Sequence, residues 1–283
     1  MTQRLTTTDH RRDAAGLHYI YPVISRRAGG LSIGINFNTN NSCNWRCVYC
    51  QVPDLKRGSA PPLDFALLES ELKHFLDRVL HGDFFDCFGV PEQQRVIKDI
   101  AISGNGEPTS LPEFAEAVRL IGEIGEAKGI FPGSGLVLIT NGSLMHQAKV
   151  QEGLRELNRF GGEVWFKLDS PTKAGRVAIN NSLESDDKVL QHLHICAGLC
   201  PTKLQTCVLN YKRYPWSQEE KQAYLELLSR IKNEIKLEKI MLYSIARQSM
   251  QPEANELTPV PEEQMREFAK RIEKLGYKVS VSV

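Results

Sequence analysis

Long apolar runs are absent from this chain of 283 residues. No stretch approaches the roughly 18 apolar residues of a membrane-spanning helix, and the N-terminus has no apolar segment resembling a signal peptide. An excess of charge is absent too, because 35 Lys and Arg balance 34 Asp and Glu, for a net charge of +1. The composition therefore gives no general reason to expect nucleic-acid or membrane binding. We expect a cytoplasmic protein, in a reducing compartment where thiols stay free.

A disulfide framework is also missing. Seven cysteines in 283 residues do not match the small, cysteine-dense chains that disulfides stabilise. Three of them nevertheless stand within eight residues, at Cys43, Cys47 and Cys50. A structural zinc site needs four ligands, usually in two separated pairs. Neither a second Cys-x-x-Cys nor a close His pair lies near this trio, so it is an incomplete set for zinc.

Three neighbouring thiolates suit iron, because cysteines hold iron–sulfur clusters, normally as a set of four. With three, one iron would lack a protein ligand and be open to a small molecule. The spacing of Cys43, Cys47 and Cys50 resembles that of the radical S-adenosylmethionine (SAM) superfamily. The resemblance implies a [4Fe-4S] cluster on these cysteines, SAM on the open iron, and an electron donor such as flavodoxin or ferredoxin. It also implies cleavage of SAM to a 5′-deoxyadenosyl radical that abstracts hydrogen from a substrate.

Strands and helices alternate along the chain. Strands are predicted at 31–37, 96–103, 136–140, 163–169, 203–210 and 239–245, each followed by a helix, with a last strand at 277–283. This order predicts a parallel sheet with right-handed crossovers. Six units are too few for a closed eight-fold barrel. We therefore expect an α/β fold, a curved, open, partial (β/α)6 barrel of the radical SAM type with an extra C-terminal strand.

The domain organisation and some local features follow from the same pattern. Residues 1–30 are expected to form an N-terminal arm and an irregular lead-in, and residues 31–283 one core domain. Ser217 and Glu220 match a capping box at the start of a helix. Two prolines mark residues 246–259 as an exposed loop.

Unusual polar stretches follow the strands, and ligands bind at the carboxyl ends of strands in such sheets. Glycines allow close approach of the backbone to a ligand, and Glu107 adds an anion for a cationic partner. The stretch after the second strand resembles the superfamily's Gly-Gly-Glu-Pro motif, which binds the methionyl ammonium group of SAM, with Asn105 inserted. It consists of Gly104, Asn105, Gly106, Glu107 and Pro108. Without the cysteines, such a Gly-x-Gly turn is a weak signal, and a structural turn would be the preferred explanation.

Further residues at the same rim are candidates for contact with SAM. Lys167 and Asp169 are two apart on a strand and share one face. They can meet a carboxylate and a ribose hydroxyl, or simply form a salt bridge. Thr140 and Asn141 can contact the cofactor or only close a turn. The resemblance implies that Tyr49 and the Ile245-Ala246-Arg247 segment lie near the adenine.

The substrate is specified less well. Ser25–Asn36 resembles the segment before the cluster in wyosine-type tRNA-modifying radical enzymes and their uncharacterised bacterial relatives. Tyr211–Trp216 interleaves aromatic and basic residues, as suits RNA, or forms a solvated loop with packed aromatics. Three functions stay open: modification of RNA or a nucleotide, activation or modification of a partner protein or peptide, and non-catalytic electron transfer. Cys196, Cys200 and Cys207 are candidates for an auxiliary cluster or for plain buried thiols.

Overall fold

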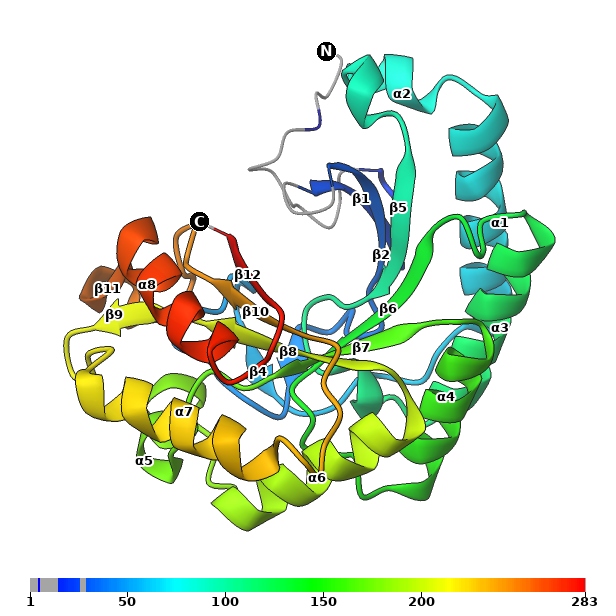
Figure 1. Ribbon diagram of the computed structural model, residues 1–283. Coiled ribbons are helices and arrows are strands. Elements are labelled where there is room, and N and C mark those ends of the chain that lie inside the picture. Colours follow the sequence, from blue (N-terminus) through cyan, green and yellow to red (C-terminus); the bar gives the residue numbers. More distant parts are fainter. Residues whose placement is uncertain (1–4, 6–14, 26–28, 283) are drawn as a thin grey trace.

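The structure is a computed structural model that describes residue 5, residues 15–25 and residues 29–282. Most of the expected N-terminal arm, and Arg26 and Arg27 of the lead-in, lie outside the described residues. An eight-stranded sheet, in the order β1-β2-β5-β6-β7-β8-β10-β12, curls into an open half-barrel with the long helices on its outer side (Figure 1). Neighbouring strands from β2 to β12 are parallel. The predicted partial barrel is confirmed.

The strands of this sheet are short and the helices between them are longer. The sheet strands are β1 (Ile20–Ser25), β2 (Gly30–Ile35), β5 (Ile97–Ile102), β6 (Gly135–Thr140), β7 (Glu163–Lys167), β8 (Thr202–Cys207), β10 (Lys239–Tyr243) and β12 (Val279–Ser282). The outer helices are α1 (Phe65–His81), α3 (Phe114–Ala127), α4 (Ala148–Arg159), α6 (Asp186–Leu199), α7 (Gln218–Ile231) and α8 (Glu262–Glu273). The smaller elements are β3 (Ser42–Cys43), β4 (Lys56–Arg57), α2 (Phe84–Cys87), α5 (Lys173–Asn180), β9 (Leu209–Tyr211) and β11 (Leu257–Pro259).

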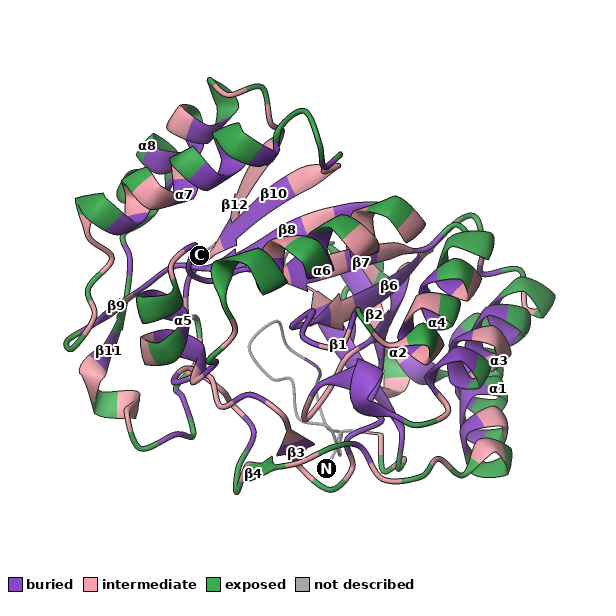
Figure 2. Cartoon of the chain, turned by 90° about the horizontal axis from the view of Figure 1, so that it is seen from below, coloured by how far each residue is buried: buried purple, intermediate pink, exposed green. Residues whose placement is uncertain are grey.

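The main hydrophobic core lies between the sheet and its helices. α1 shows how the sequence builds it, because its buried residues recur every three or four positions and include Leu68, Leu72 and Phe75. Asp64 begins this helix by accepting a hydrogen bond from the Leu67 amide at 3.0 Å. Figure 2 shows the helices buried on their inner side and exposed on their outer side. No helix among the described residues is long and apolar enough to cross a membrane.

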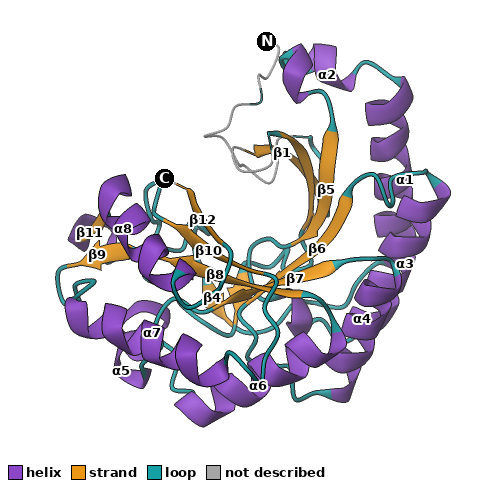
Figure 3. Ribbon diagram, viewed as in Figure 1, coloured by secondary structure: helices purple, strands orange, loops and turns teal. Residues whose placement is uncertain are grey.

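The expected irregular lead-in is wrong, because Ile20–Ser25 forms β1. This strand pairs antiparallel with β2 at one edge of the sheet, opposite β12 at the other edge (Figure 3). Pro22 argued against a strand, but an edge strand tolerates a residue without an N–H group. The Tyr21 ring lies so close to Gly34 that a Cβ there would come within 2.1 Å of it. Glycine at this position therefore lets Tyr21 cross β2 and bond Ser103, with 2.9 Å between the hydroxyl oxygens.

The predicted capping box is only half formed. Ser217 Oγ accepts a hydrogen bond from the Glu220 amide at 3.3 Å, as a cap should. The Glu220 side chain does not reach back to Ser217. Its carboxylate accepts hydrogen bonds from the hydroxyls of Ser170, Thr172 and Tyr214, at 2.8, 2.7 and 2.7 Å. The Glu220 carboxylate thus accepts three hydrogen bonds from hydroxyl groups instead of the one from the Ser217 amide that a capping box requires.

Residues 246–259 are not simply an exposed loop. Ser249 Oγ donates to the Val48 carbonyl at 2.7 Å, and the Met250 amide donates to the Cys50 carbonyl at 2.9 Å. β11, at the end of this segment, pairs antiparallel with β9. The segment is held because backbone groups of the cysteine loop need partners once that loop is buried.

Candidate active site

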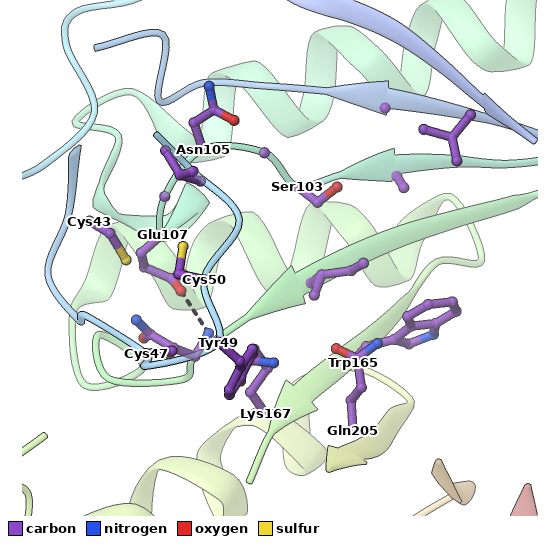
Figure 4. A pocket seen from close by; sticks show the side chains of 18 of the residues that line it. Cys43, Cys47, Tyr49, Cys50, Ser103, Asn105, Glu107, Trp165, Lys167 and Gln205 are labelled. Carbon is purple, nitrogen blue, oxygen red and sulfur yellow. Dashed lines mark hydrogen bonds between the residues drawn. The ribbon is translucent and has the colours of Figure 1, made fainter. Parts of the chain in front are cut away.

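A cavity of about 380 Å³ opens on the concave side of the half-barrel (Figure 4). One end is formed by the cysteine loop and the glycine motif, and the other by side chains on the strands. Ten predicted site residues line it: Cys43, Cys47, Tyr49, Cys50, Gly104, Asn105, Gly106, Glu107, Asn141 and Lys167. Pro108, Thr140 and Asp169 do not line it. The structure thus brings most of the predicted site together.

The cysteine loop is held from behind by the end of α5. The Arg46 and Val48 amides donate to the carbonyls of Asn180 and Ile179, at 3.2 and 2.8 Å. Two N–H groups reach sulfur atoms directly. The Trp45 amide donates to Cys43 Sγ at 3.4 Å, and Asn180 Nδ2 donates to Cys47 Sγ at 3.2 Å. Such donors orient metal ligands and tune the potential of an iron–sulfur cluster.

The three cysteines are free thiols in a partly buried setting. Burial raises the pKa of Cys43 and of Cys47 to about 12, because a buried thiolate lacks hydration. Bound metal supplies the positive charge that deprotonates coordinating thiols. Among the described side chains, no group of three His, Cys, Asp or Glu suits one metal ion. Three cysteine thiolates are the donor type that holds iron–sulfur clusters, so the chemistry of this donor set suits a cluster.

The glycine motif packs directly against the start of the cysteine loop. A Cβ at Gly106 would come within 2.0 Å of the Ser42 carbonyl oxygen, so only glycine fits without displacement. Asn105, the residue that departs from the superfamily motif, connects the two loops. Its amide donates to Asn36 Oδ1 at 2.9 Å, and its Nδ2 donates to Asn41 Oδ1 at 2.7 Å. The inserted side chain therefore fixes the motif to the cysteine loop.

Glu107 is 2% exposed, and the chain itself supplies its partners. Oε1 accepts from the Thr109 amide, the Thr109 hydroxyl and the Thr140 hydroxyl, at 3.1, 2.6 and 2.6 Å. Oε2 accepts from the Asn141 amide at 2.6 Å. Burial raises the pKa of Glu107 despite these bonds. Thr140 therefore supports Glu107 from behind, while Oε2 keeps acceptor capacity toward the cavity.

Lys167 and Asp169 share one side of the sheet, as expected, but only Lys167 lines the cavity. Lys167 Nζ donates to the Tyr243 hydroxyl at 2.8 Å and lies 3.8 Å from Asp169 Oδ1. Burial alone would lower the pKa of Lys167, but the charge of Asp169 raises it overall. Asp169 accepts from the Tyr49 hydroxyl, from Asn180 Nδ2 and from the amide of Cys207. Asp169 does not line the cavity, and its expected contact with the ribose of SAM stays a prediction.

The aromatic residues of the Tyr211–Trp216 segment are buried or partly buried, whereas Lys212, Arg213 and Pro215 are exposed. Tyr211 is buried, and Arg213 forms an ion pair with Glu256 at 2.6 Å. The Trp216 ring packs edge-on against Phe268, with 5.3 Å between centroids. These rings are therefore occupied within the fold, as in the alternative of a loop with packed aromatics.

The remaining candidate cysteines are all buried, but they do not form one group. Cys196 and Cys200 belong to the main hydrophobic core, whereas Cys207 belongs to a separate cluster with Val48 and Leu209. Cys200 Sγ donates to the Gly162 carbonyl at 3.4 Å. Their surroundings are those of packed thiols.

Sequence reasoning missed the residues at the strand end of the cavity. These residues are Ser32, Asp99, Trp165 and Gln205 on the strands. Ala246 and Arg247, from the segment expected near the adenine, also line the cavity. One signal was present, since Asp99 is the single acid of the predicted strand 96–103 and directly precedes its apolar run Ile100-Ala101-Ile102. An acid at such a position needs a partner, which the sequence alone does not identify.

Comparison with known proteins agrees with this architecture. No family model matches the chain. A UPF0026 protein of Helicobacter pylori is 28% identical over 150 residues, which cover 53% of this chain and 41% of the relative. The chain thus spans about two fifths of that relative's length. A UPF0026 protein of Synechocystis is 27% identical over 221 residues, which cover 75% of this chain and 71% of the relative.

Several solved structures share the fold at low sequence identity. A radical SAM methyltransferase from Sphaerobacter thermophilus matches with a TM-score of 0.58 and 14% identity, over 94% of this chain and 70% of its own. The hydrogenase maturase HydG matches with a TM-score of 0.57 and 14% identity, over 88% and 50%. The enzyme anSMEcpe, solved with AdoMet and a peptide, matches with a TM-score of 0.51 and 16% identity, over 88% and 62%. The chain has the half-barrel fold of radical SAM enzymes, as predicted.

Proposed function

We propose that the protein is a radical SAM enzyme in which Cys43, Cys47 and Cys50 hold a [4Fe-4S] cluster. One observation carries the proposal: these cysteines and the glycine motif meet at one end of one cavity, inside a fold of the radical SAM type. When bound and reduced, the cluster supplies the electron that cleaves SAM to a 5′-deoxyadenosyl radical, and the radical takes hydrogen from a substrate. A flavodoxin or ferredoxin is the expected class of electron donor.

The residues of this chain bind and position SAM in the proposal. Glu107 Oε2 faces the cavity with acceptor capacity, which suits the methionyl ammonium group. Lys167 stays cationic, because Asp169 raises its pKa, and so suits the carboxylate. Tyr49 offers an aromatic face for the adenine, and its hydroxyl is fixed by Asp169. The structural neighbour anSMEcpe was solved with AdoMet bound, which supports SAM as the ligand class.

An enzyme is favoured over an electron carrier by the length of the cavity. It extends from the cysteines along the strands to Trp165 and Gln205, well beyond the residues that would hold a cluster. Two classes of substrate are proposed. The first is an RNA or a nucleotide that the enzyme modifies, and the second is a partner protein or peptide. RNA that copurifies with the protein and dissociates steeply with salt would favour the first class.

Mixing the anaerobically reconstituted, reduced protein with SAM tests the proposal. We expect 5′-deoxyadenosine by mass spectrometry, and we expect none from Cys47→Ala. Cys87→Ala is the matched control, since this free cysteine lies on α2, outside the cavity lining. A fully reconstituted, reducible cluster that yields no 5′-deoxyadenosine would contradict the enzyme proposal and leave the carrier as the better function.

A further inference from the structure

The strand end of the cavity is continuous with the proposed SAM site. Alternate residues of a strand share one face, so Trp165 and Lys167 of β7 both point into the cavity. Asp99 reaches it in the same way from β5, and Gln205 from β8. Figure 4 shows Trp165 and Gln205 close together, on the side away from the three cysteines. These side chains therefore face whatever lies beyond SAM.

Asp99 is a buried acid with no cationic partner among the described residues. It is 8% exposed and accepts a hydrogen bond from the Ser32 hydroxyl, its partner in the strand pairing. Among the residues that the structure describes, no Lys, Arg or His lies within ion-pair distance of it, whereas Glu163 pairs with Lys203 at 2.6 Å. Burial raises the pKa of Asp99, and the charge of Glu163 raises it further. A carboxylate in such surroundings is stabilised by a cation or by strong donors.

The facing wall is apolar and fixed in orientation. Trp165 Nε1 donates to Glu163 Oε1 at 2.8 Å, which holds the indole in place. The ring is only partly buried, so it offers a flat surface to the cavity. Gln205 is 5% exposed, and its amide makes no hydrogen bond to any other described side chain or backbone group. Asp99, the Trp165 ring and the Gln205 amide thus line the same cavity, on the strands of the sheet.

We propose that this end of the cavity binds a positively charged nitrogen group of the substrate, with Asp99 as its anion and Trp165 as its apolar wall. The inference rests on the proposed function, because it assigns the substrate end of the same cavity. An ammonium or guanidinium group would complete the hydrogen bonding of Asp99 and gain a cation–π contact with the indole.

Isothermal titration of the reconstituted protein with benzylamine tests the assignment. We expect Asp99→Asn to weaken benzylamine binding at least about tenfold, the loss expected for a charge-assisted hydrogen bond. Benzyl alcohol, the neutral analogue, should change by less than about twofold between the two proteins. Asp187→Asn is the matched control, because it removes an exposed acid on α6. It should bind benzylamine like the wild type.

Two sources of the nitrogen group can be distinguished with a third probe, N-acetyl-lysine methylamide. Tighter binding of this probe than of benzylamine assigns a basic peptide side chain, and the reverse assigns a free amine. Equal benzylamine affinity of wild type and Asp99→Asn would overturn the proposal. If Asp99→Asn does not fold, the wild type alone decides, because benzylamine must bind at least about tenfold tighter than benzyl alcohol.

The cation site and the cofactor chemistry can fail separately. If the wild type binds benzylamine through Asp99 but forms no 5′-deoxyadenosine, the SAM proposal fails and the cation site stands. If the wild type cleaves SAM and benzylamine binding does not depend on Asp99, the present inference alone fails.

Discussion

The two ends of the cavity differ in how their acids are satisfied. At the cysteine end, Glu107 accepts four hydrogen bonds from the chain and Asp169 accepts three. At the strand end, Asp99 accepts one, from Ser32. An acid whose bonds are made within the chain holds its surroundings in place before any ligand arrives. An acid left with one bond takes the rest from a ligand, so the first end suits a constant cofactor and the second a particular substrate.

The largest expected effect is loss of the metal centre from the cysteine end. We expect Cys43→Ala, Cys47→Ala and Cys50→Ala each to lose the cluster, since no other thiol among the described residues lines the cavity. Cys196→Ala should retain it, because Cys196 lies in the main core. Iron content after anaerobic reconstitution measures both results. An intact cluster in Cys47→Ala would contradict the proposal that these three cysteines hold the cluster.

A matched pair of acid-to-amide changes compares the two ends directly. In Glu107→Gln either orientation of the amide sets an NH₂ group against a backbone N–H, of Thr109 or of Asn141. An unsatisfied buried donor costs about 2 kcal/mol. In Asp99→Asn the amide oxygen can still accept from Ser32 while the NH₂ faces the cavity, and a buried charge is removed. We therefore expect a loss of less than about 0.5 kcal/mol there.

Urea unfolding of both variants measures these free energies. Equal destabilisation by Glu107→Gln and Asp99→Asn would contradict the difference between the two ends. A loss of stability in Asp99→Asn alone would mean that the fold depends on Asp99 at the strand end and not on Glu107 at the cysteine end.

Local patterns explain why much of this architecture could be predicted. Each single strand or helix, the cysteine spacing and the glycine turn are contained in fewer than about 20 neighbouring residues. The pattern failed at β1, where Pro22 is compatible with a strand only because β1 lies at the sheet edge. An edge is a property of the assembled sheet, and no stretch of sequence records it.

The features that could not be predicted depend on contacts between residues that lie far apart in the sequence. Ser249 bonds Val48 across 201 residues, so residues 246–259 appeared exposed when considered alone. The same holds for Asp99, whose relation to Trp165 depends on two neighbouring strand pairs, β5–β6 and β6–β7. Lys167 and Asp169 were correctly placed on one side of the sheet. Only the tertiary structure shows that Tyr49 separates Asp169 from the cavity.

A smaller effect should come from His192, which lies under the cysteine end. Burial, followed by the charges of His146 and Lys188, lowers the pKa of His192 to about 4. The unfolded state, with a His pKa of about 6.5, therefore binds a proton between these values that the folded state does not. Stability should fall as pH drops through this window, by about 1 kcal/mol per pH unit at the steepest.

His192→Gln should remove this slope and leave the part due to Glu184. That acid lies 3.5 Å from His192, and burial raises its pKa. Glu184 binds its proton at a higher pH in the folded state than in the unfolded state. Its protonation therefore raises stability as the pH falls, opposite to the effect of His192. The free energy of unfolding in urea, measured for both proteins at about pH 7.5, 6 and 5, separates the contribution of His192 from that of Glu184. The same pH dependence in wild type and His192→Gln would show that His192 is not held neutral.

The smallest expected effect concerns the outer side of the cysteine loop. Arg46 donates two hydrogen bonds to Glu253, at 2.8 and 2.7 Å, with side chains 31% and 12% exposed. Solvent screens a pair this exposed, so Arg46→Met and Glu253→Gln should show a coupling energy of about 0.5 kcal/mol in a double-mutant cycle. The hydrogen-exchange rates of amides 43–50 should rise in both variants, while those of β5 stay constant. Unchanged exchange in the loop would mean that Ser249 and its neighbours hold the cysteine end without this ion pair.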